Sequence, residues 1–179
     1  MANVFDVADF FVQLANQSED DQITNLKLNK LLYYAQGAFL ARTGHPLFHN
    51  TMEAWPLGPV IPDVYHKYKV CGKNPIASAE SSLDRSKFSC DELEVLLDVM
   101  REFGQYTGSA LVSFTHKPGT PWSNAIAAGD ESLDLTDMKD YFTAHPVPHF
   151  SDQISSAQVT KLPADWYDPT EDAEWEAYL

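Results

Sequence analysis

The sequence has few cysteines, few basic residues and no long apolar run. Two of its 179 residues are cysteine and 12 are lysine or arginine, against 26 aspartates and glutamates. No run approaches the ~18 apolar residues that a membrane-spanning helix needs. Asp6 and Asp9 precede the first basic residue, Lys27, so we expect no signal peptide with a basic amino-terminal region. These absences predict a cytoplasmic protein with no membrane partner.

Cysteine and histidine are too scattered to predict a metal site. Cys71 and Cys90 do not form a CxxC pair, and in the cytosol we expect both to be free thiols. Two histidine pairs have a ligand-like spacing, namely His45 with His49 and His145 with His149. Both pairs enclose proline and lack a neighbouring cysteine or carboxylate in a known ligand pattern. The sequence therefore predicts neither a metal nor a cofactor.

The net charge of −14 is unevenly distributed. Residues 25–75 contain six basic and two acidic residues, whereas the segments on both sides are acidic. A duplex-binding domain usually has a strong basic face, so this balance argues against nucleic acid as a partner. A basic protein partner matches the overall charge better. Charge alone leaves open the alternative of an acidic surface that only keeps the protein soluble.

Known catalytic motifs are absent. The chain has no GxGxxG, GxSxG or HExxH sequence. Gly72-Lys73 is not part of a phosphate-binding loop, because position 67 is lysine instead of the required glycine. Asp91, Glu92 and Glu94 open a predicted helix, where negative charge favours the helix dipole. We therefore predict that the protein is not an enzyme and has no catalytic residues.

Apolar periodicity predicts a mainly helical chain. The expected helices span about residues 4–15, 24–42, 62–68, 89–103, 109–115, 121–128 and 136–144. Ser89 and Glu92 have the spacing of a capping box, and a short strand is expected at 51–55. We predict a mainly α (α+β) fold, a compact helical domain with a small β-hairpin or minor antiparallel sheet.

The helix at 24–42 should be the central core helix. It carries one long apolar stripe, made of Leu28, Leu31, Leu32, Ala35 and Phe39. Tyr33 and Tyr34 point to different sides of this helix, so we expect one of the two to lie near the surface.

Proline and glycine shape the segment that follows this helix. In Trp55-Pro-Leu-Gly58-Pro59, proline fixes φ and glycine permits positive φ, which predicts a shaped turn between an extended segment and a helix. A second stiffened segment contains His116 and Trp122. Trp122 either belongs to a recognition surface or fills the core beside a helix start, and the second role is commoner for a large aromatic residue. The same two readings apply to Trp55 and Tyr65.

The carboxyl-terminal segment differs from the rest of the chain. Residues 164–179 carry six acidic residues and no basic one. They also carry four aromatic residues, Trp166, Tyr167, Trp175 and Tyr178. Acidic segments that only solvate a protein are usually poor in aromatics, so this composition favours a segment that docks on its own domain or on a partner.

The motifs resemble, in their order, the Panacea or SocA-like antitoxin domain family of prokaryotic and phage-associated proteins. The matching segments are 26–37, 44–48, 53–55, 58–60, 62–65, 115–122 and 141–142. The sequence departs from the family pattern at Asn29, where glutamine is commoner, and at Ala38, where an aromatic is frequent. The resemblance divides the chain into an antitoxin domain at 1–146 and an acidic extension at 147–179.

This resemblance implies a non-enzymatic antitoxin that binds and neutralises a cognate protein toxin, encoded by an adjacent gene. Two alternatives stay open: an adaptor that delivers a toxin or other client to a AAA+ protease, and a transcriptional regulator of its own operon. The acidic balance and the lack of a clear helix-turn-helix argue against the regulator. The candidate partner contacts are the residues of the family pattern: Tyr34, Gln36, Trp55, Gly58, Pro59, Tyr65, His116 and Trp122.

Overall fold

The computed structural model describes residues 1–17, 22–77 and 84–150. Within these ranges the chain forms seven α-helices, two short 3-10 helices and one two-stranded sheet. The α-helices are α1 (Val4–Ala15), α2 (Asn25–Thr43), α3 (Pro62–Tyr68), α4 (Cys90–Phe103), α5 (Gly108–Thr115), α6 (Pro121–Ala128) and α7 (Leu135–Ala144). Strands β1 (Glu53–Trp55) and β2 (Gly58–Val60) pair antiparallel, and η1 (Lys69–Cys71) and η2 (Arg85–Lys87) are the 3-10 turns. The predicted mainly helical fold with a small hairpin is confirmed.

Side-chain caps define the helix ends. The Ser89 hydroxyl accepts a hydrogen bond from the Glu92 backbone N–H at 3.2 Å, and the Glu92 carboxylate accepts one from the Ser89 N–H at 2.9 Å. This is the capping box that the sequence predicts, and it satisfies two otherwise unpaired donors at the start of α4. Gly44, in the left-handed conformation, ends α2.

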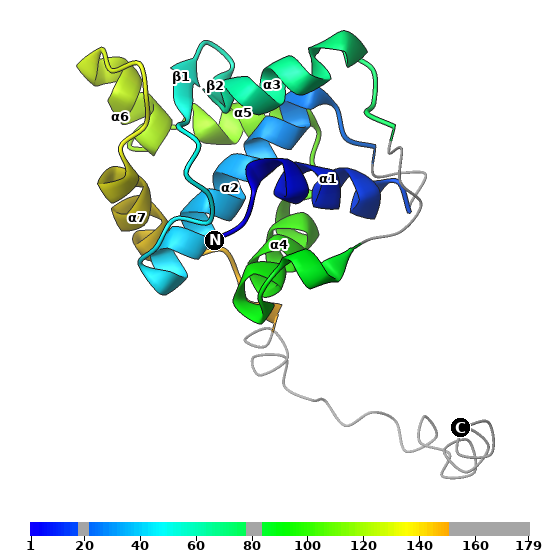
Figure 1. Cartoon of the computed structure of the whole chain (residues 1–179). Helices are drawn as coiled ribbons and strands as arrows, with labels where there is room; N and C mark the ends of the chain where they lie inside the picture. Colours follow the sequence, from blue (N-terminus) through cyan, green and yellow to red (C-terminus); the bar gives the residue numbers. More distant parts are fainter. Residues whose placement is uncertain (18–21, 78–83, 151–179) are drawn as a thin grey trace, which may run out of the picture. The chain divides into compact units, whose positions relative to one another are not determined.

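Helix α2 runs through the middle of the unit Met1–Val147. It packs against the hairpin and against α1, α3, α4, α5 and α7 (Figure 1). Because neighbours cover it on every side, Tyr33 and Tyr34 are only 1% and 7% exposed. The expectation that one of them lies near the surface is therefore wrong. Tyr34 stacks on Phe103 of α4 with ring centroids 3.8 Å apart.

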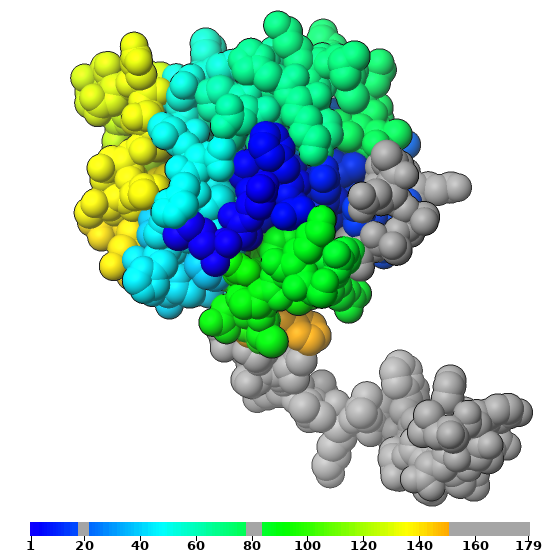
Figure 2. Space-filling view, viewed as in Figure 1, coloured from blue at the N-terminus to red at the C-terminus, as the bar shows by residue number. Residues whose placement is uncertain are grey.

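Helix α7 approaches α2 closely at a glycine. A Cβ atom at Gly37 would lie 2.1 Å from the ring of Phe142, which occupies that space. On another side of α2, helix α1 lies between α3 and α4 on the face shown in Figure 2. Among the described residues, no helix combines the length and apolar character needed to cross a membrane.

Gln36 fixes the chain that leads from α2 to the hairpin. Its side-chain oxygen accepts hydrogen bonds from the backbone N–H groups of Leu47 and Phe48 at 2.9 and 3.2 Å. Its side-chain nitrogen donates to the Phe48 carbonyl at 3.0 Å. Gln36 is buried, so these three bonds satisfy a polar group that burial would otherwise penalise. The segment before β1 is thereby held against the core.

Candidate functional site: a groove beside the hairpin

The hairpin is short and tightly turned. Trp55 pairs with Gly58 in the antiparallel register, which leaves Pro56 and Leu57 in the connecting turn. Gly58 has a φ of +98°, so the predicted positive φ is confirmed. The strand expected over 51–55 is shorter than predicted and begins at Glu53.

The buried side chain of Lys30 packs against the hairpin. The Lys30 amine donates a hydrogen bond to the Pro59 carbonyl at 2.8 Å, and the residue has no exposed surface. Burial lowers the pKa of this amine to about 7. A Cβ atom at Gly58 would lie 2.7 Å from the Thr115 hydroxyl oxygen and 2.8 Å from Cε of Lys30. The hairpin therefore rests directly on these two side chains, and this contact requires glycine at position 58.

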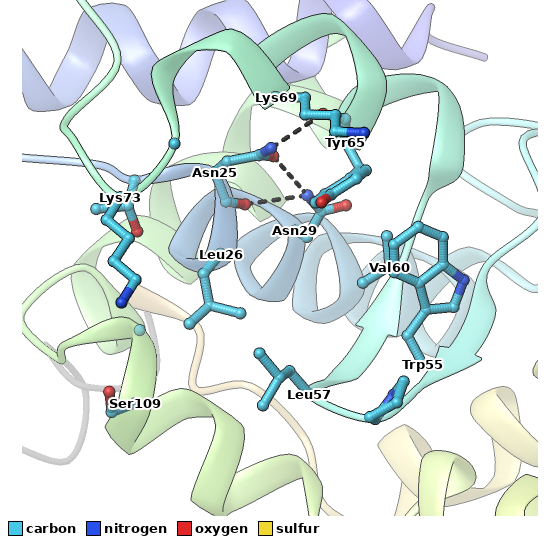
Figure 3. A pocket seen from close by; sticks show the side chains of 14 residues that line it. Asn25, Leu26, Asn29, Trp55, Leu57, Val60, Tyr65, Lys69, Lys73 and Ser109 are labelled. Carbon is cyan, nitrogen blue, oxygen red and sulfur yellow. Dashed lines mark hydrogen bonds between the residues drawn. The ribbon is translucent and has the colours of Figure 1, made fainter.

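Two asparagines of α2 hold the start and the middle of α3. The Asn29 side-chain oxygen accepts a hydrogen bond from the Ile61 N–H at 3.0 Å, while its nitrogen donates to the Asn25 carbonyl at 3.0 Å. The Asn25 side chain donates to the Tyr65 carbonyl at 2.9 Å (Figure 3). The hairpin, α3 and the first turns of α2 are thereby joined by buried polar bonds.

Trp55 and Trp122 connect the hairpin to α6. The Trp122 indole donates to the Trp55 carbonyl at 2.8 Å, and its ring stacks on His116 with centroids 3.8 Å apart. Trp55 donates to the Glu53 carboxylate at 2.7 Å and meets the ring of Tyr65 edge-to-face at 4.9 Å. Both indoles are half-buried, so each packs within the domain and keeps part of its surface open to solvent.

His116 lies at the inner edge of this cluster. Its Nε2 atom is buried without a hydrogen-bond partner among the described residues. Desolvation, together with the nearby Lys30 amine, lowers the pKa of His116. A neutral ring is therefore favoured at this position.

A groove of about 830 Å³ opens between the hairpin, the start of α2, the end of α3 and the start of α5. Its lining residues are Thr24, Asn25, Leu26, Asn29, Trp55, Pro56, Leu57, Val60, Tyr65, Lys69, Gly72, Lys73, Gly108 and Ser109. Leu26 and Leu57 point toward each other across the hollow, with Lys73 and Trp55 on opposite sides of them (Figure 3). The leucine at the hairpin tip, Leu57, is 57% exposed. An open apolar groove with exposed leucine is typical of a binding surface.

The structure distributes the candidate residues over three places. Trp55 and Tyr65 line the groove, and Gly58 and Pro59 form the adjoining strand. His116 and Trp122 lie on the side of the hairpin that faces α6. Tyr34 and Gln36 are in the core and do not line the groove. The tail residues Trp166, Tyr167, Trp175 and Tyr178 lie outside the described residues.

Several groups of this site were not singled out from the sequence. Asn25 and Lys30 are not among the candidate contacts predicted from the sequence, and Asn29 stands out only as a departure from the family pattern, although all three hold the hairpin and α3 in place. The sequence signal that could have identified them is that polar residues recur outside the apolar stripe of a helix that is central to the fold. Lys69 and Lys73 line the groove at positions that carry no motif.

Other chemistry at this site is limited. In the part of the chain that the structure describes, no three histidine, cysteine, aspartate or glutamate side chains come together as metal ligands would. Cys71 and Cys90 are both free thiols, as predicted. The groove instead offers apolar surface, two aromatic rings and two ammonium groups, which suit it to binding.

Comparison with known proteins identifies a matching family and a curated relative. The family described as "Antitoxin SocA-like, Panacea domain" matches residues 28–123. Antitoxin SocA of Caulobacter vibrioides (strain NA1000 / CB15N) is 36% identical over 119 residues. That alignment covers 62% of this chain and 63% of the relative, so the chain matches less than two thirds of the relative's length. No solved structure is significantly similar to the chain.

Proposed function

Because the chain belongs to the SocA-like antitoxin family of Panacea-domain proteins, we propose that it is the antitoxin of a toxin–antitoxin pair. In this proposal it neutralises a cognate protein toxin, the product of an adjacent gene, by binding it directly. Binding alone accounts for such a role, so the proposal requires neither a catalytic residue nor a cofactor.

The family match carries this proposal. It spans residues 28–123, which include most of α2, the hairpin, α3 and the segment with His116 and Trp122. Helix α2, the hairpin and α3 contribute to the groove, and hydrogen bonds join these elements to one another and to Trp122. A rigid, pre-formed surface supports direct binding, because little conformational entropy is lost when a partner docks.

Growth of cells that make the toxin tests this proposal. The product of the adjacent gene is expressed from an inducible promoter, with or without the full chain from a second plasmid. We expect the chain to restore colony formation to the level of cells without toxin. The Leu28→Asp variant is the control: it places a carboxylate at a fully buried core position, so it should unfold the domain and abolish the rescue.

Failure of the folded wild-type chain to restore growth, with both proteins present at comparable levels, would refute the antitoxin assignment. The abundance of the toxin separates two mechanisms. Sequestration leaves the toxin level unchanged, whereas delivery to a AAA+ protease lowers it in a protease-dependent manner.

A further inference from the structure

We propose that the groove beside the hairpin binds an extended segment of the toxin, and that this segment carries an apolar side chain flanked by carboxylates. This inference rests on the proposed function, because its occupant is the toxin. It adds to that function the surface that binds and the chemistry that this surface recognises.

The centre of the groove selects for an apolar side chain. Leu26 and Leu57 face each other across the hollow, and Val60 closes it from the side of β2 (Figure 3). Leu57 is 57% exposed and occupies the tip of a turn that Gly58 and the Lys30 contact hold in one conformation. An exposed leucine on a rigid turn can bury its surface against a partner without a large loss of conformational freedom.

The charge of the groove selects for carboxylates. Its 14 lining residues include Lys69 and Lys73 and no aspartate or glutamate, although the chain has 26 acidic and 12 basic residues. Among the described residues, neither lysine forms an ion pair with a carboxylate. The groove is thus a positive region on a protein of net negative charge, and it attracts acidic groups of a partner. This differs from the basic partner that the net charge alone favours.

The two asparagines that line the groove use their hydrogen-bonding groups within the protein. The side chains of Asn25 and Asn29 are bonded to each other and to the backbone of Tyr65 and Ile61. Their hydrogen-bonding groups are therefore occupied in the free protein. Recognition then depends on the apolar centre and on the two ammonium groups.

Calorimetric titration of the full chain with the purified product of the adjacent gene tests this inference. Two groove variants are compared with the wild type: Leu57→Asp, and Lys69→Glu combined with Lys73→Glu. We expect each to weaken binding at least about tenfold. The loss in the lysine variant should be larger at low salt than at high salt, because screening reduces the interaction of exposed charges.

Two control variants each make a single substitution of the same kind elsewhere. Leu97→Asp alters another exposed leucine, 44% exposed on α4, and Lys139→Glu alters an exposed lysine of α7. Neither residue lines the groove. Both controls should bind within about twofold of wild type, since surface residues outside an interface contribute little. Circular dichroism establishes that every variant is folded.

The outcomes separate this inference from the proposed function. Wild-type chain that neither binds the toxin nor rescues growth refutes both. Wild-type binding that the groove variants retain in full overturns the inference and leaves the proposed function standing. If Leu57→Asp abolishes self-association instead, a second copy occupies the groove. If Leu57→Asp tightens toxin binding, the chain's own acidic segment 164–179 occupies it. Either result overturns the assignment to the toxin.

Discussion

The free energy of unfolding should rise by about 2 kcal/mol between pH 7 and pH 9, and Lys30→Met should remove this rise. The cause is the Lys30 amine, whose pKa is about 7 in the folded domain and 10.5 as an ordinary lysine. Below pH 7 the amine is protonated in both states, so the full cost of burying a charge weakens the fold. Above pH 7 only the unfolded chain retains the proton, and this cost is relieved.

Other groups limit the useful pH range. Burial raises the pKa of Tyr34 well above its ordinary value, so the fold should lose stability once tyrosines of the unfolded chain ionise near pH 10. Urea unfolding at pH 7, 8 and 9 therefore stays below the range in which tyrosines ionise, and comparison with Lys30→Met isolates the contribution of the lysine. The Lys30→Met variant keeps an unbranched side chain, one atom shorter, and leaves the Pro59 carbonyl without its donor. Its stability relative to wild type should fall as the pH increases.

The control for this experiment is Lys139→Met, which removes an exposed amine from α7. Because that amine is solvated in both states, this variant should keep the pH dependence of wild type. Parallel pH profiles for Lys30→Met and wild type would contradict the account of Lys30 as a buried amine beneath the hairpin.

Gly58→Ala should lower the free energy of unfolding by about 3 kcal/mol, the sum of a backbone cost and a packing cost. The backbone cost arises because position 58 has a φ of +98°, which side chains other than glycine rarely adopt. The packing cost arises because the new Cβ would meet Thr115 and Lys30 at 2.7 and 2.8 Å. Both neighbours are buried and hydrogen-bonded, so they cannot easily move away.

Gly119→Ala is the matched control for this substitution. Gly119 has a similar φ of +83°, but nothing lies within 4 Å of its Cβ position. The Gly119→Ala variant should therefore lose only the stability that corresponds to the backbone cost. The difference between the free energies of unfolding of the two variants, measured in urea, then gives the packing cost at the hairpin. In a Thr115→Ala background this difference should shrink. Equal destabilisation by Gly58→Ala and Gly119→Ala would show that the hairpin does not press on Lys30 and Thr115.

Local sequence signals predicted most of the secondary structure. The capping box at Ser89 and Glu92 and the apolar spacing of α2 each depend on residues close together in the sequence, so they can be recognised from it. The burial of Tyr33 and Tyr34 could not be predicted in this way. It depends on Phe103 and Phe142, which arrive from α4 and α7 and cover two sides of the same helix.

The candidate site was predicted only in part, for a related reason. The prolines and glycine of the segment Trp55–Pro59 predict a turn from the sequence, and Gly58 has the positive φ that this pattern indicates. A lysine gives no such signal, because most lysines are exposed. Lys30 is buried only because the hairpin folds over it, and the groove exists only because α2, α3 and α5 meet beside that hairpin. Such a site can be predicted only when the packing of elements far apart in the sequence is known.

The mass of the complex in solution tests direct toxin binding most directly. The purified full chain and the purified product of the adjacent gene are mixed and passed through a size-exclusion column with light-scattering detection. The proposed function predicts one new peak that contains both proteins and has the mass of a stoichiometric complex. Two separate peaks with the masses of the individual proteins, at concentrations where the chain rescues growth, would contradict neutralisation by direct binding.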